Sequence, residues 1–346
     1  MTGIAAPEQS PSAPEPNAVG GPPIAPLDPA RVLAHPAGRD ALADLVDRLR
    51  MVGYDGHPVA GPGGAPADDG ISSVVALARR LPVAQRELTD ALGTASVDAL
   101  LACGVLGHVD EGLVITATIF PMRSVFTVVP GPEPGRDVVY LGPDSLVLFE
   151  MVWAGRGHGD RAVDLATGNG FLAAAMATRY DHVIAADLSR RCVSTAALVP
   201  LMNPHLRTRF AAVQVDVAAG LEPGAFDLVT GNPPWVPETV GPAGGPPRRF
   251  AAGGPTGFEL PRRFLDATTD LLAPGGRAFI ACLDIVFADG HRPLAEHLPR
   301  LTDRGVAVDV VETRLNRAFD YSSWARGKLP DATAARHVVV EVRRPS

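Results

Sequence analysis

The sequence predicts an α/β protein in which a smaller helical, winged-helix-like domain precedes a seven-stranded parallel sheet. Its 346 residues are enough for two folded units, at roughly 100–200 residues per domain. Apolar residues make up 46% of the chain and charged residues 20%, so the side chains for a sizeable core are present. From Tyr140 onward, short β-rich runs alternate with helical patterns, which is typical of βαβ units and a parallel sheet.

The first 135 residues are expected to form a tail and a small domain. Residues 1–30 are rich in proline and lack basic residues, which predicts a disordered tail. Residues 31–135 form the domain, with helices predicted at Pro29–Val52, Leu81–Leu92 and Ser96–Leu106, a loop at Gly53–Gly70, and strands at Gly112–Phe120 and Ser124–Val129. The helix from Ser96 contains no Arg or Lys to meet phosphates. A structural or substrate-recognition role is therefore favoured over DNA binding.

Residues 136–346 are expected to form the domain that carries the sheet. Strands are predicted at Ala162–Leu165, Val183–Asp187, Phe210–Val215, Phe226–Thr230, Arg277–Cys282, Val306–Thr313 and His337–Val342. Helices are predicted at Leu146–Trp153, Phe171–Arg179, Arg190–Leu201, Phe258–Leu272 and Leu294–Asp303. The first of these helices is expected to pack over the first strand.

A glycine-containing loop follows the first strand of this sheet. Within Val163–Gly170, the glycines Gly168 and Gly170 allow the backbone to approach a ligand beyond the carboxyl end of the strand. A phosphate-binding Walker loop needs Gly-Lys-Ser/Thr, which this loop lacks, and Ala173 stands where the dinucleotide fingerprint has its third glycine. The loop is of a nucleotide-binding type, but neither ATP nor NAD is favoured.

Two acidic residues follow the next two strands. Asp187 ends the second strand, where a carboxylate can accept hydrogen bonds from both hydroxyls of a ribose. Asp216 lies just past the third strand and is placed to accept from an adenine amino group. Each acid alone is also typical of a helix cap or a turn. Together with the glycine loop, their positions on successive strands favour an adenosyl site.

The fourth strand ends in Asn232-Pro233-Pro234-Trp235. Two prolines stiffen the backbone, so that the Asn232 amide and the Pro233 carbonyl can face a cleft, and Trp235 offers a ring on which a planar substrate can stack. The two oxygens can accept both N–H bonds of a planar NH2 group and leave its lone pair facing an electrophile. Asn232, Pro233 and Trp235 are therefore the candidate catalytic residues.

These motifs resemble those of class I S-adenosylmethionine-dependent methyltransferases, which have a Rossmann-like sheet. The resemblance implies that S-adenosylmethionine is the cofactor and that its site contains Asp164, Ala166, Thr167, Gly168, Gly170, Asp187, Leu188, Asp216, Val217 and Asn232. Asn-Pro-Pro-aromatic motifs are found in enzymes that methylate planar nitrogens, including adenine-N6 methyltransferases. Residues 249–259 and 271–276 further resemble the HemK/PrmC family of glutamine-N5 methyltransferases.

The resemblance covers about residues 140–285, and the sequence departs from the HemK/PrmC pattern in two places. The aromatic position of the motif is Trp235, where Tyr or Phe is usual. Residues 31–130 predict a winged-helix-like pattern, where those enzymes have a helical bundle. These departures leave methyl transfer as the expected chemistry without assigning a release factor as the substrate.

Four further residues are candidate substrate contacts, in addition to Trp235. Arg248 and Arg249 lie in a Gly/Pro-rich insertion that could contact a carboxylate or phosphate, or could be a solvated loop. Tyr321 and Trp324 lie between the last two strands and either line the substrate pocket or pack in the core. The histidines follow no ligand spacing, so no metal site is predicted. The three cysteines are widely separated and are expected to be buried.

The predicted function is an N-methyltransferase acting on a planar amide or amino nitrogen of a protein or a small molecule, including a specialised metabolite. A net charge of −7 makes nucleic acid the less favoured partner, and no stretch is long and apolar enough to cross a membrane, so a cytoplasmic location is expected. Three alternatives stay open: an adenine-N6 methyltransferase of nucleic acid, a cyclase or aminocarboxypropyl transferase that releases methylthioadenosine, and a non-catalytic cofactor-binding regulator. The oligomeric state cannot be read from the sequence.

Overall fold

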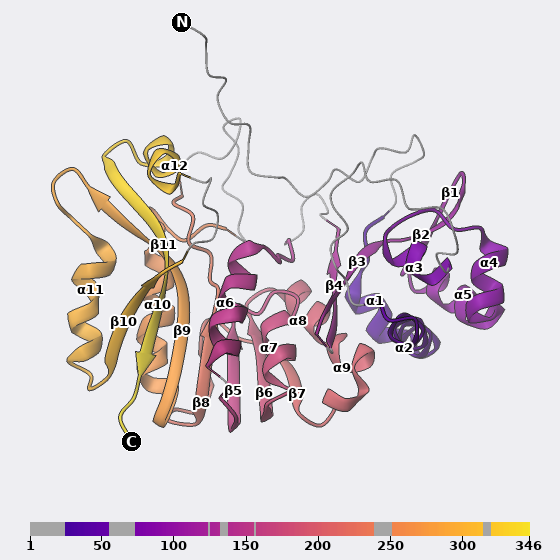
Figure 1. Ribbon diagram of the computed structural model, residues 1–346, viewed down its shortest axis with the longest axis horizontal. Helices are drawn as coiled ribbons and strands as arrows, with labels where there is room; N and C mark the ends of the chain where they lie inside the picture. Colours follow the sequence, from indigo (N-terminus) through magenta and orange to yellow (C-terminus); the bar gives the residue numbers. More distant parts are fainter. Residues whose placement is uncertain are drawn as a thin grey trace, which may run out of the picture.

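The computed structural model places a group of helices and β-hairpins beside a twisted sheet that is covered by helices (Figure 1). It describes residues 25–54, 73–123, 125–131, 138–155, 157–238, 251–313 and 320–346. No helix among these residues is long and apolar enough to cross a membrane.

The first group, here called the N-terminal unit, consists of helices and two hairpins. Its helices are α1 (Pro29–Ala34), α2 (Pro36–Met51), α3 (Ser73–Ala78), α4 (Gln85–Leu92) and α5 (Thr94–Ala102). Strands β1 (Leu106–Val109) and β2 (Gly112–Ile115) form one hairpin, and β3 (Ala117–Met122) and β4 (Val125–Pro130) form the other. Val83, just before α4, forms an isolated antiparallel bridge with Leu113 of β2.

Seven strands form the main sheet in the order β10-β11-β9-β8-β5-β6-β7. They are β5 (Gly159–Leu165), β6 (Tyr180–Asp187), β7 (Phe210–Gln214), β8 (Phe226–Gly231), β9 (Leu272–Phe287), β10 (Ala307–Glu312) and β11 (Ala332–Arg343). Strands β5 to β9 pair in parallel, whereas β11 runs antiparallel to both β9 and β10. The seven-stranded sheet expected from the sequence is confirmed, and β11 is antiparallel to its neighbours in an otherwise parallel sheet.

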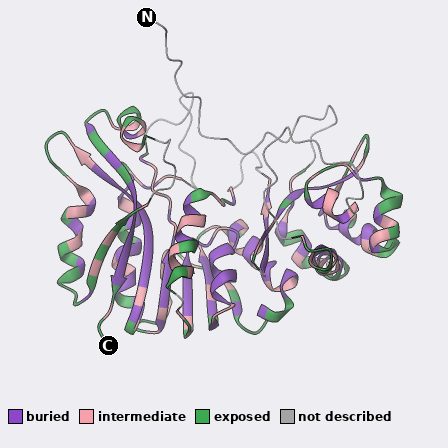
Figure 2. Ribbon diagram, in the orientation of Figure 1, coloured by how far each residue is buried: buried purple, intermediate pink, exposed green. Residues whose placement is uncertain are grey.

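Helices cover both faces of the sheet. They are α6 (Pro143–Ala154), α7 (Phe171–Met176), α8 (Arg190–Ala196), α9 (Val199–Met202), the 3₁₀ turn η1 (Pro204–Leu206), α10 (Glu259–Leu271), α11 (Pro293–Thr302) and α12 (Tyr321–Lys328). Apolar side chains of α6 and α7 pack on one face, and those of α10 and α11 pack on the other. The central strands and the whole of α7 are buried as a result, whereas α10 and α11 have exposed outer faces (Figure 2). The α/β fold predicted from the sequence is confirmed.

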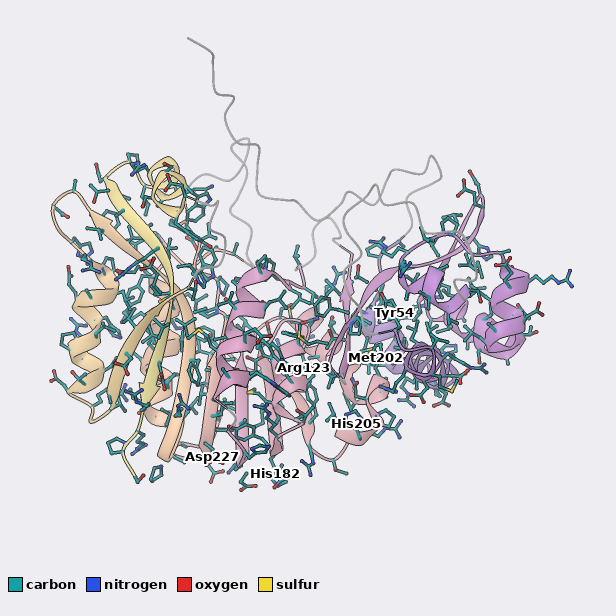
Figure 3. All side chains as sticks on the ribbon, viewed as in Figure 1. Tyr54, Arg123, His182, Met202, His205 and Asp227 are labelled. Carbon is teal, nitrogen blue, oxygen red and sulfur yellow. The ribbon has the colours of Figure 1, made fainter. Side chains whose placement is uncertain are left out.

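The N-terminal unit and the sheet share one hydrophobic cluster. Leu198 lies between α8 and α9, and Met202 is the last residue of α9. Both are buried among the apolar side chains of α2, α5 and the hairpins. Met202 faces the N-terminal helices (Figure 3). Asn203 adds hydrogen bonds to the backbone of Phe126 in β4. The two parts are therefore held together by buried contacts.

Several element boundaries differ from those expected, and most differences have a local cause. The predicted helix Pro29–Val52 is broken at His35, because Pro36 begins a new helix. Pro200 likewise lies in the first turn of α9 and splits the predicted helix Arg190–Leu201. Residues 81–84, predicted as the first turn of a helix, are extended instead because Val83 pairs with β2.

Most of the predicted tail and loop (residues 1–24 and 55–72) lies outside the described residues. Leu27, within the predicted tail, is buried.

Candidate active site

A cavity of about 1000 Å³ lies at the carboxyl ends of β8, β5, β6 and β7. The chain runs from β5 outward to β6 and β7 and then returns to β8 on the other side of β5, so the cavity lies where the strand order reverses. This is the place where open α/β sheets bind ligands. The cavity is at the opposite edge of the sheet from His182 and Asp227, which lie near the starts of their strands (Figure 3).

Most of the residues predicted to bind the cofactor share this cavity. Those that line it are Asp164, Ala166, Thr167, Gly168, Asp187, Leu188, Asp216, Val217 and Asn232. Gly170 does not line it. Its left-handed φ of +79° begins α7, and a Cβ at this position would lie 3.0 Å from the Cβ of Ala196. Gly170 therefore allows α7 and α8 to pack closely.

The loop after β5 has an unusual backbone. Ala166 has a φ of +55° and Gly168 a φ of +58°, a region that side-chain-bearing residues rarely occupy. A Cβ on Gly168 would lie 3.0 Å from the backbone oxygen of Tyr140, so glycine also allows this close approach. The loop thus presents its backbone to the cavity.

Asp164 lies buried beneath this loop. One of its oxygens accepts from the hydroxyl of Thr167 at 2.6 Å and the other from the hydroxyl of Thr230 at 2.7 Å. Burial raises the pKa of Asp164 to about 6, and the nearby negative charge of Asp187 adds to this rise. A cationic group placed close to Asp164 would favour its charged form and oppose this rise in pKa.

Asp187 is held by two backbone donors. Its Oδ2 accepts from the N–H of Gly168 at 3.0 Å, and its Oδ1 accepts from the N–H of Ser189 at 2.9 Å. A carboxylate oxygen can accept more than one hydrogen bond, so a carboxylate at this position suits the two hydroxyls of a ribose. The next residue, Leu188, is 65% exposed although it is apolar, and it lines the cavity with Val217. An exposed apolar side chain at this position can pack against the face of a planar heterocycle such as adenine.

Asn232 has a fixed amide group. Its Nδ2 donates to Oδ2 of Asp144 at 3.0 Å and to the hydroxyl of Ser145 at 3.1 Å. Because a carboxylate can only accept, the NH2 side of the amide must face Asp144 and the oxygen must face away. Asn232 Oδ1 is buried and has no hydrogen-bond partner among the described residues. A buried carbonyl oxygen without a donor is costly.

Tyr140 completes this end of the cavity. Its hydroxyl donates to Oδ1 of Asp144 at 2.8 Å, and its side chain, 40% exposed as a residue, lines the cavity. Burial raises the pKa of the Tyr140 phenol, and the negative charge of Asp144 raises it further, so Tyr140 acts as a donor at neutral pH. Asp144 therefore accepts from Tyr140 and from Asn232 at the same time.

The other predicted catalytic and substrate residues lie differently. Trp235 packs edge-on against Trp324, at 6.2 Å between ring centroids, and against His337 at 5.3 Å. Trp235, Tyr321 and Trp324 belong to one apolar cluster and are not among the described residues that line the cavity, nor is Pro233. Arg248 and Arg249 lie outside the described residues. The structure therefore brings Trp235, Tyr321 and Trp324 together, beside the cavity and not in its wall.

Sequence reasoning missed Tyr140, Asp144 and Ser145. The available signal was an acid and a serine directly after Gly142-Pro143, where a proline in the first helical turn marks a helix start and a carboxylate is favoured. The predicted helix began only at Leu146, which left these two residues in a loop. The three cysteines are buried as expected. Within the described ranges, no group of three or more His, Cys, Asp and Glu residues is placed to hold a metal ion.

Residues 143–241, which include α6, β5 to β8 and the Asn-Pro-Pro-Trp motif, match the sequence profile of the Methyltransferase small domain. The chain is an S-adenosylmethionine-dependent methyltransferase. The acids, the strained loop and the uncovered Leu188 fit the cofactor of these enzymes, which has an ammonium group, a ribose and an adenine ring. No curated protein matches the chain.

Solved structures with a similar fold include three methyltransferases. The E. cuniculi Mtq2–Trm112 complex, described as responsible for methylation of the termination factor eRF1, is 20% identical over 60% of this chain and 98% of its own, with a TM-score of 0.39. Phosphoethanolamine N-methyltransferase 2 of Haemonchus contortus is 14% identical over 60% and 55%, with a TM-score of 0.41. Geranyl diphosphate C-methyltransferase of Streptomyces coelicolor is 12% identical over 58% and 78%, with a TM-score of 0.42. Similarities this low carry no argument about the methyl acceptor of this methyltransferase.

Proposed function

We propose that this methyltransferase transfers a methyl group to a planar amide or amino nitrogen of a protein or a small molecule. The observation that carries the proposal is the buried Oδ1 of Asn232, which has no donor among the described residues. The amide cannot turn to hide this oxygen, because Asp144 and Ser145 hold its NH2 side. An acceptor NH2 group at the cavity would supply the missing donor.

In this proposal, the protein binds and orients the nitrogen and does not need a strong base to activate it. One N–H of the acceptor donates to Asn232 Oδ1 and the other to the Pro233 carbonyl, so the nitrogen lone pair is left facing the cavity. S-adenosylmethionine supplies an electrophilic methyl group on its sulfonium. Asn232, Ser145 and Tyr140 line the acceptor end of the cavity, where they would orient the nitrogen toward the methyl group.

The charge of the N-terminal unit supports a protein or small-molecule acceptor. On α5, the helix that would enter a DNA groove in a winged helix, Asp98 is exposed and no residue is basic. The turn between β1 and β2 carries exposed Asp110 and Glu111. Carboxylates at these positions repel phosphates, which disfavours a nucleic-acid substrate.

The proposal is tested by identifying products with the purified enzyme. Methyl-labelled S-adenosylmethionine is incubated with glutamine-containing peptides, small planar amides and amines, and duplex DNA, and mass spectrometry identifies the labelled product and the spent cofactor. Labelled nitrogen in a peptide or small molecule, with release of S-adenosylhomocysteine, is expected. Release of methylthioadenosine would support the cyclase or aminocarboxypropyl alternative, and labelled adenine in DNA would overturn the proposed acceptor class.

The role of Asn232 is tested separately. Asn232→Ala should lower kcat at least about 100-fold, the scale for losing one oriented group at a reacting centre. The affinity for S-adenosylhomocysteine should change much less, because the lost contact is to the acceptor. Asn232→Asp adds a charge and removes the amide donor to Asp144, so it should also be impaired. Near-normal turnover by a correctly folded Asn232→Ala enzyme would overturn the amino-group mechanism.

A further inference from the structure

An ion pair between α10 and the loop after β7 lies in the wall of the cavity. Arg263 on α10 places its Nη2 2.9 Å from Oδ1 of Asp216, which follows β7. Both residues line the cavity. Their side chains are 50% and 53% exposed. An exposed ion pair of this kind contributes little to folding stability. Its position in the cavity wall therefore points to a role in ligand binding.

The order of the strands indicates how a bound cofactor would lie across the cavity. Asp164 and Asp187 lie at the carboxyl ends of β5 and β6, and Asn232 and Asp216 follow the strands on either side of these two, β8 and β7. Neighbouring strands lie roughly 4.8 Å apart, so Asn232 and Asp216 are separated by about 14 Å across the sheet. If the methyl group is at Asn232 and the ribose at Asp187, the adenine ring lies beyond Asp187, between Leu188 and Val217 and against Asp216.

The backbone on both sides of Asp216 has a defined conformation, whereas its carboxylate has few contacts. Val217 has a φ of +55°, which is strained for a β-branched residue and turns the chain directly after Asp216. The side-chain amide of Gln214 donates to the carbonyl oxygen of Leu188 at 3.0 Å and ties the end of β7 to the other side of the adenine space. The carboxylate of Asp216, however, is half exposed and has no partner other than Arg263 among the described residues.

We propose that Arg263 is a positioning residue for cofactor recognition: it holds one oxygen of Asp216 so that the other accepts from the 6-amino group of adenine. A carboxylate can accept on both oxygens, so the ion pair and the adenine contact are compatible. Without Arg263, the half-exposed carboxylate turns toward water and must be ordered again when the cofactor binds. Arg263 acts through Asp216 and not on the reacting atoms. The inference concerns the cofactor and is independent of which acceptor is methylated.

The test compares two ligands by calorimetry: S-adenosylhomocysteine, and its purine analogue with hydrogen in place of the 6-amino group. The parent protein should bind S-adenosylhomocysteine about tenfold more tightly than the analogue, the scale for one hydrogen bond to a charged group. Arg263→Gln should weaken S-adenosylhomocysteine binding about fivefold to tenfold and leave analogue binding within about twofold, so that the preference disappears. Arg263→Lys should restore part of the preference, because an ammonium group can also hold the carboxylate.

Two controls complete the experiment. Arg262→Gln changes the neighbouring arginine of α10, which pairs with Asp266 on the same helix and does not line the cavity, and it should bind both ligands as the parent does. Asp216→Ala should abolish the preference, and adding Arg263→Gln to it should have no further effect on either ligand. Equal weakening of both ligands in Arg263→Gln would show that Arg263 only packs in the wall, and an unchanged preference would show that it is a surface ion pair; either result overturns the proposal.

Discussion

Asp144 is the residue on which the orientation of Asn232 depends. Its two oxygens accept from Tyr140 and Asn232, and it is only 5% exposed. Asp144→Ala removes the acceptor that fixes the Asn232 amide, so kcat should fall about 10-fold to 100-fold while the affinity for S-adenosylhomocysteine stays within about twofold. Steady-state kinetics and calorimetry measure the two effects. Asp160→Ala, at the opposite edge of the sheet, is the control, and unchanged kcat in a folded Asp144→Ala enzyme would remove Asp144 from the acceptor site.

His337 should make stability depend on pH. Burial lowers its pKa to about 4, although the negative charge of Asp144 opposes this change. The unfolded chain takes up the proton below its ordinary pKa of about 6.5, whereas the folded chain does so only near 4. The contribution of neutral His337, about 3 kcal/mol from this difference in pKa, is therefore present above pH 6.5 and is lost as the pH falls to 4.

Urea unfolding of the parent and of His337→Gln at pH 5 and pH 8 measures this contribution. The parent should lose more stability than the variant on going to pH 5. The raised pKa of Asp164 acts in the opposite direction, since its contribution is full below about 3.8 and is lost as the pH rises through about 6. The comparison with His337→Gln cancels the effect of Asp164, because both proteins contain it. Equal losses in the two proteins would contradict a buried neutral histidine.

Ala166 adopts a left-handed backbone, with a φ of +55°, that costs an alanine more than a glycine. Ala166→Gly should therefore stabilise the protein by about 1 kcal/mol, measured by urea unfolding without cofactor. Ala174 in α7 has no positive φ, and Ala174→Gly should destabilise the protein instead, because glycine is disfavoured inside helices and the site is buried. Destabilisation by Ala166→Gly would show that the Ala166 side chain contributes packing that outweighs the backbone strain.

At the scale of elements, the segment that leads into α1 is docked onto the core of the N-terminal unit. Leu27, just before it, is 1% exposed and its N–H donates to the carbonyl oxygen of Thr116, while Asp28 caps the helix. Leu27→Ala should destabilise the protein by about 2–5 kcal/mol, the range for a large apolar side chain lost from a core. Met51→Ala, on a side chain that is 73% exposed at the end of α2, should change stability by less than about 0.5 kcal/mol. Similar small effects in both variants would show that the segment before α1 is not docked.

The elements that the sequence identified best are those with strong local patterns. Strands β5 to β8 form short apolar runs that end at polar residues, so both their positions and the residues at their ends could be predicted. Helix α12 was missed, because it has a single buried residue, Ala325, and so lacks an apolar stripe. The antiparallel direction of β11 was also missed, since a strand direction depends on long-range pairing that local periodicity does not contain.

The acceptor end of the site shows the same limit. The sequence identified Asn232 from its neighbours Pro233 and Pro234, but Asp144 precedes it by 88 positions and meets it only in the folded chain. The role expected of Trp235 was inferred from its place in the motif. In the structure, Trp324 and His337 occupy the space around its ring, and both come from elements after β9. Residues that act together across such distances are recognised only once the topology is known.

At the scale of the whole molecule, Asn203 joins the N-terminal unit to the sheet. It is fully buried, its Oδ1 accepts from the N–H of Phe126 at 2.8 Å, and its Nδ2 donates to the carbonyl oxygens of Phe126 at 2.7 Å and Val199 at 2.8 Å. Arg50 of α2 adds a hydrogen bond to the carbonyl oxygen of Met202 at 2.9 Å. Since Leu198 and Met202 lie in the same apolar cluster, the parent protein should unfold in one calorimetric transition.

Asn203→Ala leaves the buried backbone groups of Phe126 without partners, which should cost about 2–4 kcal/mol. We expect the N-terminal unit to separate first, so that calorimetry shows two transitions in place of one. Cofactor binding should weaken as well, because Asp28, Pro29 and Ala30 of this unit form part of the cavity wall. Arg207→Ala, an exposed change near the same turn, should leave the single transition and the binding unchanged. A single transition with full cofactor affinity in Asn203→Ala would mean that apolar packing alone couples the two parts, and that the cavity wall does not depend on the hydrogen bonds of Asn203.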